Sequence, residues 1–273
     1  MASAILRKAW QGKWAVVTGA SAGIGEAIAV QLAEAGMNLV LTARRRERLE
    51  VLAKRLSEQH SITVKVIVAD LNQAQAPQQI FDATEGAGLP VEVLVNNAGF
   101  GEYGEFLSSR LEMQVDMVQV NCTAVVHLTR LFLPKMVERR RGGVLIVAST
   151  ASYQPVPYLA TYAATKAFDR MLAEALAEEV KRYSVHVSAL CPGPTQSEFG
   201  QVSGQPPGVG GGGARKVQSA AEVARLGLEG LVAGKHWVIP YLSGRVVVFA
   251  QRFVPRRVVS RAVERMFRPP ASR

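Results

Sequence analysis

The sequence lacks the features that identify several classes of protein. It holds only two cysteines, Cys122 and Cys191, and no CxxC, which excludes a scaffold built on disulfide bonds. Its four histidines form no HExxH motif, so we expect no metal site. No run of about 18 apolar residues is present, and the first ten residues are too few and too polar for a secretory signal. These absences favour a soluble, cytoplasmic protein.

Acidic residues are scarce towards the C-terminus. The formal net charge is +10, and residues 235–273 contribute nine basic residues and one acidic residue, Glu264, whereas the rest of the chain is nearly neutral. No zinc-finger or RNP-type motif accompanies the basic tail, so we expect no nucleic-acid partner. A basic tail attracts phosphates, anionic lipids or an acidic protein, and its charge does not choose between them.

What the sequence has is an apolar content of 48%, enough for a sizeable core in 273 residues. Short apolar runs alternate with longer helical patterns, which is typical of βαβ units around a parallel sheet. We predict one doubly wound, Rossmann-type α/β domain over residues 1–243, with helices on both faces of the sheet. The expected strands are 14–18, 37–42, 63–68, 91–95, 144–148, 185–190 and 237–241. The expected helices are 24–36, 45–59, 111–139, 158–182 and one beginning at a capping box, Ser219 with Glu222.

A glycine-rich turn joins the first expected strand to the first helix. Residues 18–25 read TGASAGIG, which places Gly19, Gly23 and Gly25 in that turn. Glycine lets a backbone approach a phosphate closely, and a helix N-terminus offers free N–H groups and partial positive charge. No GxxxxGK[ST] motif exists, which excludes a P-loop nucleotidase. A plain tight turn is the alternative, but the position after the first strand favours a dinucleotide site.

Six motifs in order along the chain resemble those of the short-chain dehydrogenase/reductase family. They are the TGxxxGxG turn, Asp70 after the third strand, the NNAG motif at residues 96–99, Asn121, Ser149 with the Tyr162-x-x-x-Lys166 pair, and Pro192-Gly193. Each is weak alone, but together they cover residues 18–193 in the family's order. The resemblance implies the catalytic residues Asn121, Ser149, Tyr162 and Lys166. It also implies a cofactor site formed by Gly19, Ser21, Gly23, Ile24, Gly25, Arg44, Asp70, Asn97, Ala98, Gly99, Tyr162, Lys166, Pro192, Gly193 and Thr195.

The spacing of Tyr162 and Lys166 supports an acid–base role. Residues four apart lie on the same side of a helix, and a lysine ammonium beside a phenol lowers the tyrosine pKa from about 10. Such a tyrosine exchanges a proton with a carbonyl or alcohol oxygen, which Ser149 would hydrogen-bond. By the resemblance, Lys166 also contacts the nicotinamide ribose, and Asn121 supports a water chain to Lys166. The alternative is an incidental pair on an exposed helix.

The residues after the second strand bear on the choice of cofactor. A carboxylate there would bind the ribose 2′-hydroxyl of NAD, but the sequence places Ala43 at that position, followed by Arg44, Arg45 and Arg46. The planar fork of Arg44 suits a 2′-phosphate, so we predict NADP rather than NAD. The family's additional basic residue in the glycine turn is replaced by Ala22, which leaves NAD as the alternative.

Two segments near the C-terminus depart from the alternating pattern. Residues 200–213 contain seven glycines, which predicts a mobile substrate lid over about 198–217. The extension 244–273 contains a basic amphipathic helix over 254–267, with apolar residues at helical spacing and arginines between them. Its apolar face would lie on an anionic membrane, giving peripheral association, or pack on the body or a sister subunit. Packing is favoured, because family members commonly form homodimers or homotetramers.

The leading hypothesis is an NADP(H)-dependent oxidoreductase that interconverts a small-molecule ketone or other carbonyl and a secondary alcohol. The resemblance leaves lipid-like, steroid and acyl substrates open, because pocket residues lie in loops that carry no readable code. The alternative hypothesis is a cofactor-binding regulator or scaffold without turnover. A missing catalytic residue would favour that alternative, and none is missing.

Overall fold

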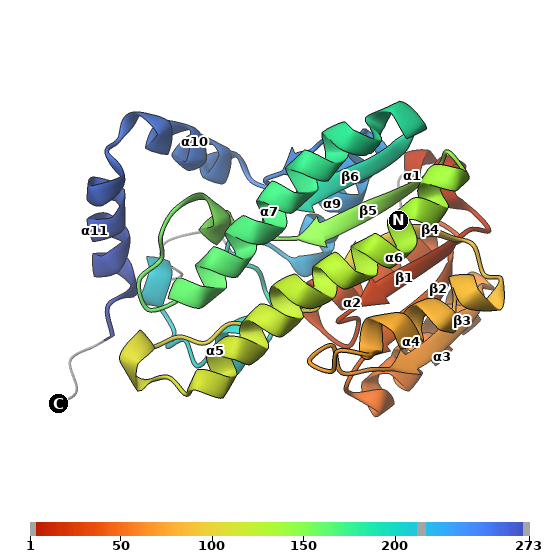
Figure 1. Ribbon diagram of the computed structural model, residues 1–273, viewed down its shortest axis with the longest axis horizontal. Coiled ribbons are helices and arrows are strands. Elements are labelled where there is room, and N and C mark those ends of the chain that lie inside the picture. The colour runs from red at the N-terminus through yellow and green to blue at the C-terminus, as the bar shows by residue number, and fades with distance from the viewer. Residues whose placement is uncertain (1–3, 212–216, 270–273) are drawn as a thin grey trace.

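The computed structural model describes residues 4–211 and 217–269, which form one parallel sheet of seven strands (Figure 1). The strand order is β3-β2-β1-β4-β5-β6-β7, so the chain reverses its winding direction between β1 and β4. The predicted fold class is therefore confirmed. The strands are β1 Trp14–Thr18, β2 Asn38–Ala43, β3 Val64–Val68, β4 Val91–Asn96, β5 Gly142–Val147, β6 Val185–Leu190 and β7 Trp237–Val238.

Helices cover both faces of the sheet. In Figure 1, α6 and α7 lie in front of the sheet, and α2 and α9 lie behind it. The rear layer consists of α1 Ala4–Trp10, α2 Gly23–Glu34, α3 Arg46–His60 and α9 Ala220–Val232, and the front layer of α4 Ala76–Asp82, α6 Ala124–Glu138 and α7 Ala160–Val180. The other α-helices in the described residues are α5 Leu111–Val118, α8 Phe199–Val202, α10 Leu242–Ala250 and α11 Arg256–Phe267.

Most strands are largely apolar because both faces of the sheet are covered; β3, at the edge of the sheet, is the exception, with Lys65 and Val68 exposed. Within β1, Ala15 and Val17 belong to the core cluster under α2 and α9, and Val16 between them belongs to the cluster under α6 and α7. Such strands show continuous apolar runs, which is why the sequence located them. The carboxyl ends of β1 and β4 are neighbours, and ligands of open α/β sheets bind at that point of reversal.

The helix predicted over 111–139 is interrupted. A π-helical turn, η3 (Gln119–Thr123), separates α5 from α6 and contains the fully buried Asn121. Single π turns inside helices occur mostly at functional sites. One wider turn hardly changes the spacing of apolar residues along the sequence. The sequence pattern therefore predicts a continuous helix.

Besides the four-residue α8 inside the predicted lid, three α-helices were not predicted. The first is α1, which buries Leu6 and Trp10 in the core beside α9. The second is α4, whose short apolar face includes the buried Ile80. The third is α10, most of whose apolar side chains are exposed. No helix among the described residues is long and apolar enough to cross a bilayer.

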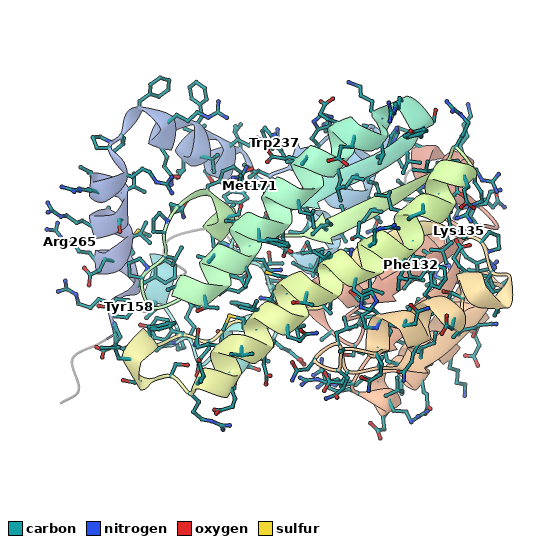
Figure 2. The ribbon with its side chains drawn as sticks, in the orientation of Figure 1. Phe132, Lys135, Tyr158, Met171, Trp237 and Arg265 are labelled. Carbon is teal, nitrogen blue, oxygen red and sulfur yellow. The ribbon has the colours of Figure 1, made fainter. Side chains whose placement is uncertain are left out.

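The predicted C-terminal helix exists as α11 and packs on the body. Val259, Val263 and Phe267, on one face of α11, join a small core cluster. The Tyr103 hydroxyl donates a hydrogen bond to the Phe267 carbonyl at 2.7 Å, and the Tyr158 hydroxyl donates one to Glu264 Oε1 at 2.9 Å. Figure 2 shows Tyr158 beside α11 and Arg265 projecting from the opposite, outer side of the helix. Of the two alternatives predicted for the apolar face of α11, packing on the body is therefore the one observed.

The predicted lid is partly described. Residues 212–216 lie outside the described residues, and the rest contains α8 and a short 3-10 turn, η6 (Val209–Gly211). Gln218 then pairs with Thr195 through a parallel bridge. The mobility of the lid stays a prediction.

Candidate active site

The glycine turn forms a tightly closed cradle at the N-terminus of α2. Gly19 adopts a φ of +65°, and a Cβ there would lie 2.9 Å from the Ala98 Cα. A Cβ on Gly25 would collide with the carbonyl oxygen of Gly19 and the side-chain amide of Asn97. Ala22, the N-cap of α2, makes no side-chain cap, so the first N–H groups of this twelve-residue helix keep their capacity for an anion.

Asn97 links the glycine turn to the end of β4. Its side-chain amide donates to the carbonyl oxygens of Thr18 and Gly19 at 2.9 and 3.2 Å. The backbone N–H groups of Asn97 and Ala98 both donate to the Thr18 hydroxyl, which donates in turn to the Val95 carbonyl. The NNAG motif therefore holds the cradle in shape through hydrogen bonds that cross from β1 to β4.

The four residues predicted to be catalytic come from three separate segments that meet at the carboxyl edge of the sheet. Ser149 follows β5, Asn121 lies in η3, and Tyr162 and Lys166 lie in the first two turns of α7. The Ser149 side chain lies close enough to Tyr162 to lower the pKa of its phenol. Gly99, from the NNAG motif, lies against this group, because a Cβ there would be 2.9 Å from Asn121 Oδ1 and 3.4 Å from Lys166 Nζ.

The π turn aims the Asn121 side chain at two neighbouring segments. Its Nδ2 donates to the Phe100 carbonyl at 2.9 Å and to the Thr165 hydroxyl at 3.0 Å. Its Oδ1 accepts from the Phe100 N–H at 3.1 Å. Asn121 thus joins the segment after β4 to the helix that carries the Tyr162–Lys166 pair.

The electrostatics of Tyr162 differ from the expectation. Burial raises the pKa of Tyr162 above its ordinary value, although the Lys166 ammonium and the Ser149 side chain both lower it. The lysine therefore acts in the predicted sense, but the predicted net lowering of the pKa is wrong for the protein by itself. Burial penalises the phenolate more than the ammonium stabilises it.

Lys166 has a buried partner that the sequence analysis missed. Its Nζ donates to Asp169 Oδ2 at 2.9 Å and to the Val147 carbonyl at 2.8 Å, and both members of the ion pair are buried. Burial opposes the ammonium, but the Asp169 carboxylate outweighs it and raises the pKa of Lys166. Lys166 therefore stays charged. Asp169 Oδ1 makes no hydrogen bond within the described part of the chain.

Of the arginines that follow β2, Arg44 makes no ion pair with the described residues, whereas Arg45 and Arg48 are bound. Arg44 is exposed. Arg45 donates from Nε and Nη2 to Ser21 Oγ in the glycine turn at 3.1 and 3.0 Å. Arg45 and Arg48 also bind the two carboxylate oxygens of Glu198, at 2.7 and 2.6 Å. The segment after β6 is thereby tied to the start of α3, a link that the sequence did not indicate.

The segment after β6 also reaches the candidate catalytic tyrosine. Phe199, in α8, places its ring centroid 5.0 Å from that of Tyr162. Gly101 lies against both rings, because a Cβ there would be 2.8 Å from Phe199 and 3.1 Å from Tyr162. The predicted lid therefore contacts the candidate site through its described residues.

The remaining predicted cofactor residues lie around the cradle. Ile24 packs on the rear core cluster, and Asp70 accepts a hydrogen bond from the Asn72 N–H after β3. Pro192 and Gly193 directly follow β6, and the Thr195 hydroxyl donates to the Gly193 carbonyl. Their contacts to a cofactor stay predictions. The uncapped helix, the cradle without room for a Cβ and the free Arg44 together fit a dinucleotide with phosphate groups.

The two cysteines have the environment of inert thiols. Cys191 is buried and Cys122 is partly buried, and burial raises the pKa of each to about 12. Both therefore stay protonated near neutral pH. A thiolate nucleophile is not available at either position.

Comparison with known proteins identifies the family. The sequence profile described as short chain dehydrogenase matches residues 13–207, well over half of the chain. The chain therefore belongs to the short-chain dehydrogenase/reductase family of oxidoreductases, as the six motifs predicted. Among curated relatives, the very-long-chain 3-oxoacyl-CoA reductase of Bos taurus is 38% identical over 189 residues. That match covers 67% of this chain and 59% of the bovine protein, so the chain spans about three-fifths of that relative.

Solved structures resemble the protein over nearly its whole length. A short-chain dehydrogenase from Sphingobium yanoikuyae in complex with NADPH has a TM-score of 0.79 and 25% identity, and the match covers 95% of this chain and 98% of that one. A 7beta-hydroxysteroid dehydrogenase has a TM-score of 0.84 and 27% identity, with coverage of 94% and 98%.

Proposed function

We propose that the protein is an NADP(H)-dependent reductase that converts the ketone of a 3-oxoacyl thioester, or a similar lipid-like ketone, to a secondary alcohol. The observation that carries this is the meeting of Ser149, Tyr162, Lys166 and Asn121 beside the glycine cradle. The bovine relative, a very-long-chain 3-oxoacyl-CoA reductase, and the NADPH complex of the structural neighbour support the substrate class and the cofactor.

The residues divide the chemistry between them. When bound, NADPH would supply the hydride that reduces the carbonyl carbon. Tyr162 gives the phenolic proton to the carbonyl oxygen, which Ser149 holds by a hydrogen bond. Lys166, kept charged by Asp169, stabilises the phenolate that remains until it takes up a proton again. In the reverse direction, the phenolate accepts the alcohol proton.

The surroundings of Tyr162 suit an apolar substrate. Tyr162 borders a cluster that includes the buried side chains of Val156, Leu159 and Val263, with Tyr103 and Phe267 packed against it. Phe199 covers the tyrosine ring from another side. Apolar walls with few polar groups bind acyl chains or other bulky apolar ketones.

The function is tested by following NADPH absorbance with 3-oxoacyl-CoA thioesters of increasing chain length, a steroid ketone and a small ketone. We expect turnover to be highest with a long acyl chain. Tyr162→Phe should lower kcat by about 10²–10⁴-fold, because it removes a positioned acid. NADPH binding, measured by fluorescence, should stay within a few-fold of wild type. NADPH binding without turnover of any ketone would overturn the proposal and favour a cofactor-binding regulator.

A further inference from the structure

The outer side of α10 carries a row of exposed apolar side chains. Leu242, Val246, Phe249 and Phe253 recur at helical spacing along α10 and the following 3-10 turn, η7 (Gln251–Phe253), and are 75%, 59%, 60% and 75% exposed. The rings of Phe249 and Phe253 pack edge to face, with centroids 5.4 Å apart. We call these four residues the apolar ridge. Isolated exposed apolar residues are ordinary, but a contiguous row that includes two phenyl rings marks a contact surface.

The ridge points away from the body of the protein. Gly244 is buried on the other side of α10, and Val248 on that side packs on the front core cluster. An amphipathic helix of a globular protein ordinarily turns its apolar face inwards, as α11 does with Val259 and Val263. Figure 1 shows α10 and α11 at the same end of the molecule, joined by a short connection.

Positive charge flanks the ridge. Residues 242–268 contain seven arginines and one acidic residue, Glu264, which is already bound by Arg268 and Tyr158. Within the described chain, no acidic partner neutralises Arg252, Arg256, Arg257 and Arg261, and all four are exposed. Exposed aromatic and aliphatic side chains bordered by free arginines match an anionic lipid surface in both its layers, the acyl boundary and the charged headgroups.

We propose that the apolar ridge and its four flanking arginines form a binding surface for anionic membranes. Phe249 and Phe253 enter the headgroup–acyl boundary, and Arg252, Arg256, Arg257 and Arg261 contact the lipid phosphates. A second copy of this face is disfavoured as the occupant, because a symmetric contact would bring two sets of unpaired arginines together. The surface is independent of the proposed reduction, since the ridge and its arginines include none of the residues assigned to the chemistry.

The test is co-sedimentation of the full chain with phosphatidylcholine vesicles that either contain or lack phosphatidylglycerol. We expect binding only to the anionic vesicles, and a sharp decrease at high salt, because screening weakens the arginine contacts. Phe249→Ser with Phe253→Ser should lower the partition coefficient at least tenfold. Arg252→Gln, Arg256→Gln and Arg257→Gln together should lower it about hundredfold, which corresponds to about 1 kcal/mol per arginine.

Matched variants elsewhere on the surface serve as controls. Ile5→Ser with Val51→Ser removes two apolar side chains of similar exposure, 63% and 71%, and should leave binding unchanged. Lys8→Gln, Lys54→Gln and Arg130→Gln remove the same charge from other elements and should reduce binding only a few-fold. Equal losses in the ridge variants and their controls would overturn the proposal. So would an absence of vesicle binding by wild type, including the case where sedimentation velocity shows that the ridge joins two copies.

Reductase activity with a soluble ketone is measured on the same samples. We expect it to be unchanged by the Phe249→Ser, Phe253→Ser pair in the absence of vesicles, which also shows that the variant is folded. Failure of the membrane proposal therefore leaves the proposed reduction untouched, and the reverse also holds.

Discussion

At the scale of single residues, the Lys166–Asp169 pair makes the most consequential contact in the site. A lysine that serves a tyrosine and a ribose must stay protonated in a buried place, and Asp169 keeps it so. The same carboxylate acts against the phenolate, because its charge raises the pKa of Tyr162. Asp169 is therefore a positioning residue with two opposing electrostatic effects, and these can be separated by experiment.

We predict that Asp169→Asn moves the pH profile of alcohol oxidation to lower pH. Oxidation needs the phenolate, so kcat/KM rises as pH passes the pKa of Tyr162. Removing the carboxylate lowers that pKa, because the phenolate loses a negative neighbour and itself still favours the charged form of Lys166. Cys122, the other titratable group near Lys166, stays a neutral thiol. We expect a shift of about one pH unit, within the effect of a single neighbouring charge.

The measurement is kcat/KM for a secondary alcohol with NADP⁺ across pH, with the thermal midpoint as a check on folding. A purely structural role for Asp169 would lower the whole profile without moving it along the pH axis. An unmoved profile in a folded Asp169→Asn variant contradicts the electrostatic role.

At the scale of elements, Arg45 and Glu198 join three segments that are distant in sequence: the glycine turn, the start of α3 and the segment after β6. Glu198 bridges Arg45 and Arg48, and these arginines lower the pKa of Glu198. The link holds the base of the predicted lid against the cofactor cradle. Of Arg44, Arg45, Arg46 and Arg48, it leaves only Arg44 without an ion pair to the described residues.

We predict that Arg44 and Arg45 affect cofactor use differently. Arg44→Ala should lower the preference for NADPH over NADH by roughly 10- to 100-fold, because it removes a charge-assisted contact to the 2′-phosphate worth about 1.5–3 kcal/mol. Arg45→Ala should weaken both cofactors to a similar degree, because it releases Ser21 and Glu198 together. The comparison is kcat/KM for both cofactors in wild type and the two variants. A cofactor ratio that changes only in Arg45→Ala would assign the phosphate contact to Arg45.

The elements also show what the sequence could predict. Strands β1 to β6 were located to within a few residues, because most are buried on both faces and so form nearly continuous apolar runs, although β3 is partly exposed. The turn η3 was missed because one π turn leaves the surrounding periodicity intact. Asp169 was missed because its spacing from Lys166 is visible in the sequence but the burial of that side of α7 is not. The helix α10 was missed because its apolar ridge faces solvent, and the sequence pattern of a helix does not show which side of it is buried.

At the scale of the whole molecule, a second exposed apolar surface lies on the front helices. Its members are Leu111 and Val115 on α5, Val126 on α6, and Phe168 and Met171 on α7. Figure 2 labels Met171 on α7, in the front layer. Because α5 contacts α7, these side chains lie on adjoining helices of one layer. A homodimer or homotetramer, as predicted, would cover this surface.

We predict that Val115→Asp with Met171→Asp produces a monomer. Two buried, unpaired carboxylates would prevent the apolar contact, whereas on a solvent-exposed surface they cost little. Sedimentation velocity measures the mass, and Val51→Asp with Ile5→Asp, on α3 and α1, is the matched control. A wild-type protein that is already monomeric at micromolar concentration contradicts the prediction.

The packing of α11 on the segment around Tyr162 has a consequence for the order in which parts of the protein fold. The buried members of the two large core clusters end at Ile239, with Val248 packed against one of them, whereas the cluster beside Tyr162 includes Val263. Because α11 is synthesised after every buried residue of the two large clusters, we expect it to pack last. The wall beside the tyrosine is added afterwards, to a body that is already in place. A nascent chain thus acquires the capacity to hold its cofactor before it acquires an enclosed site in which to use it.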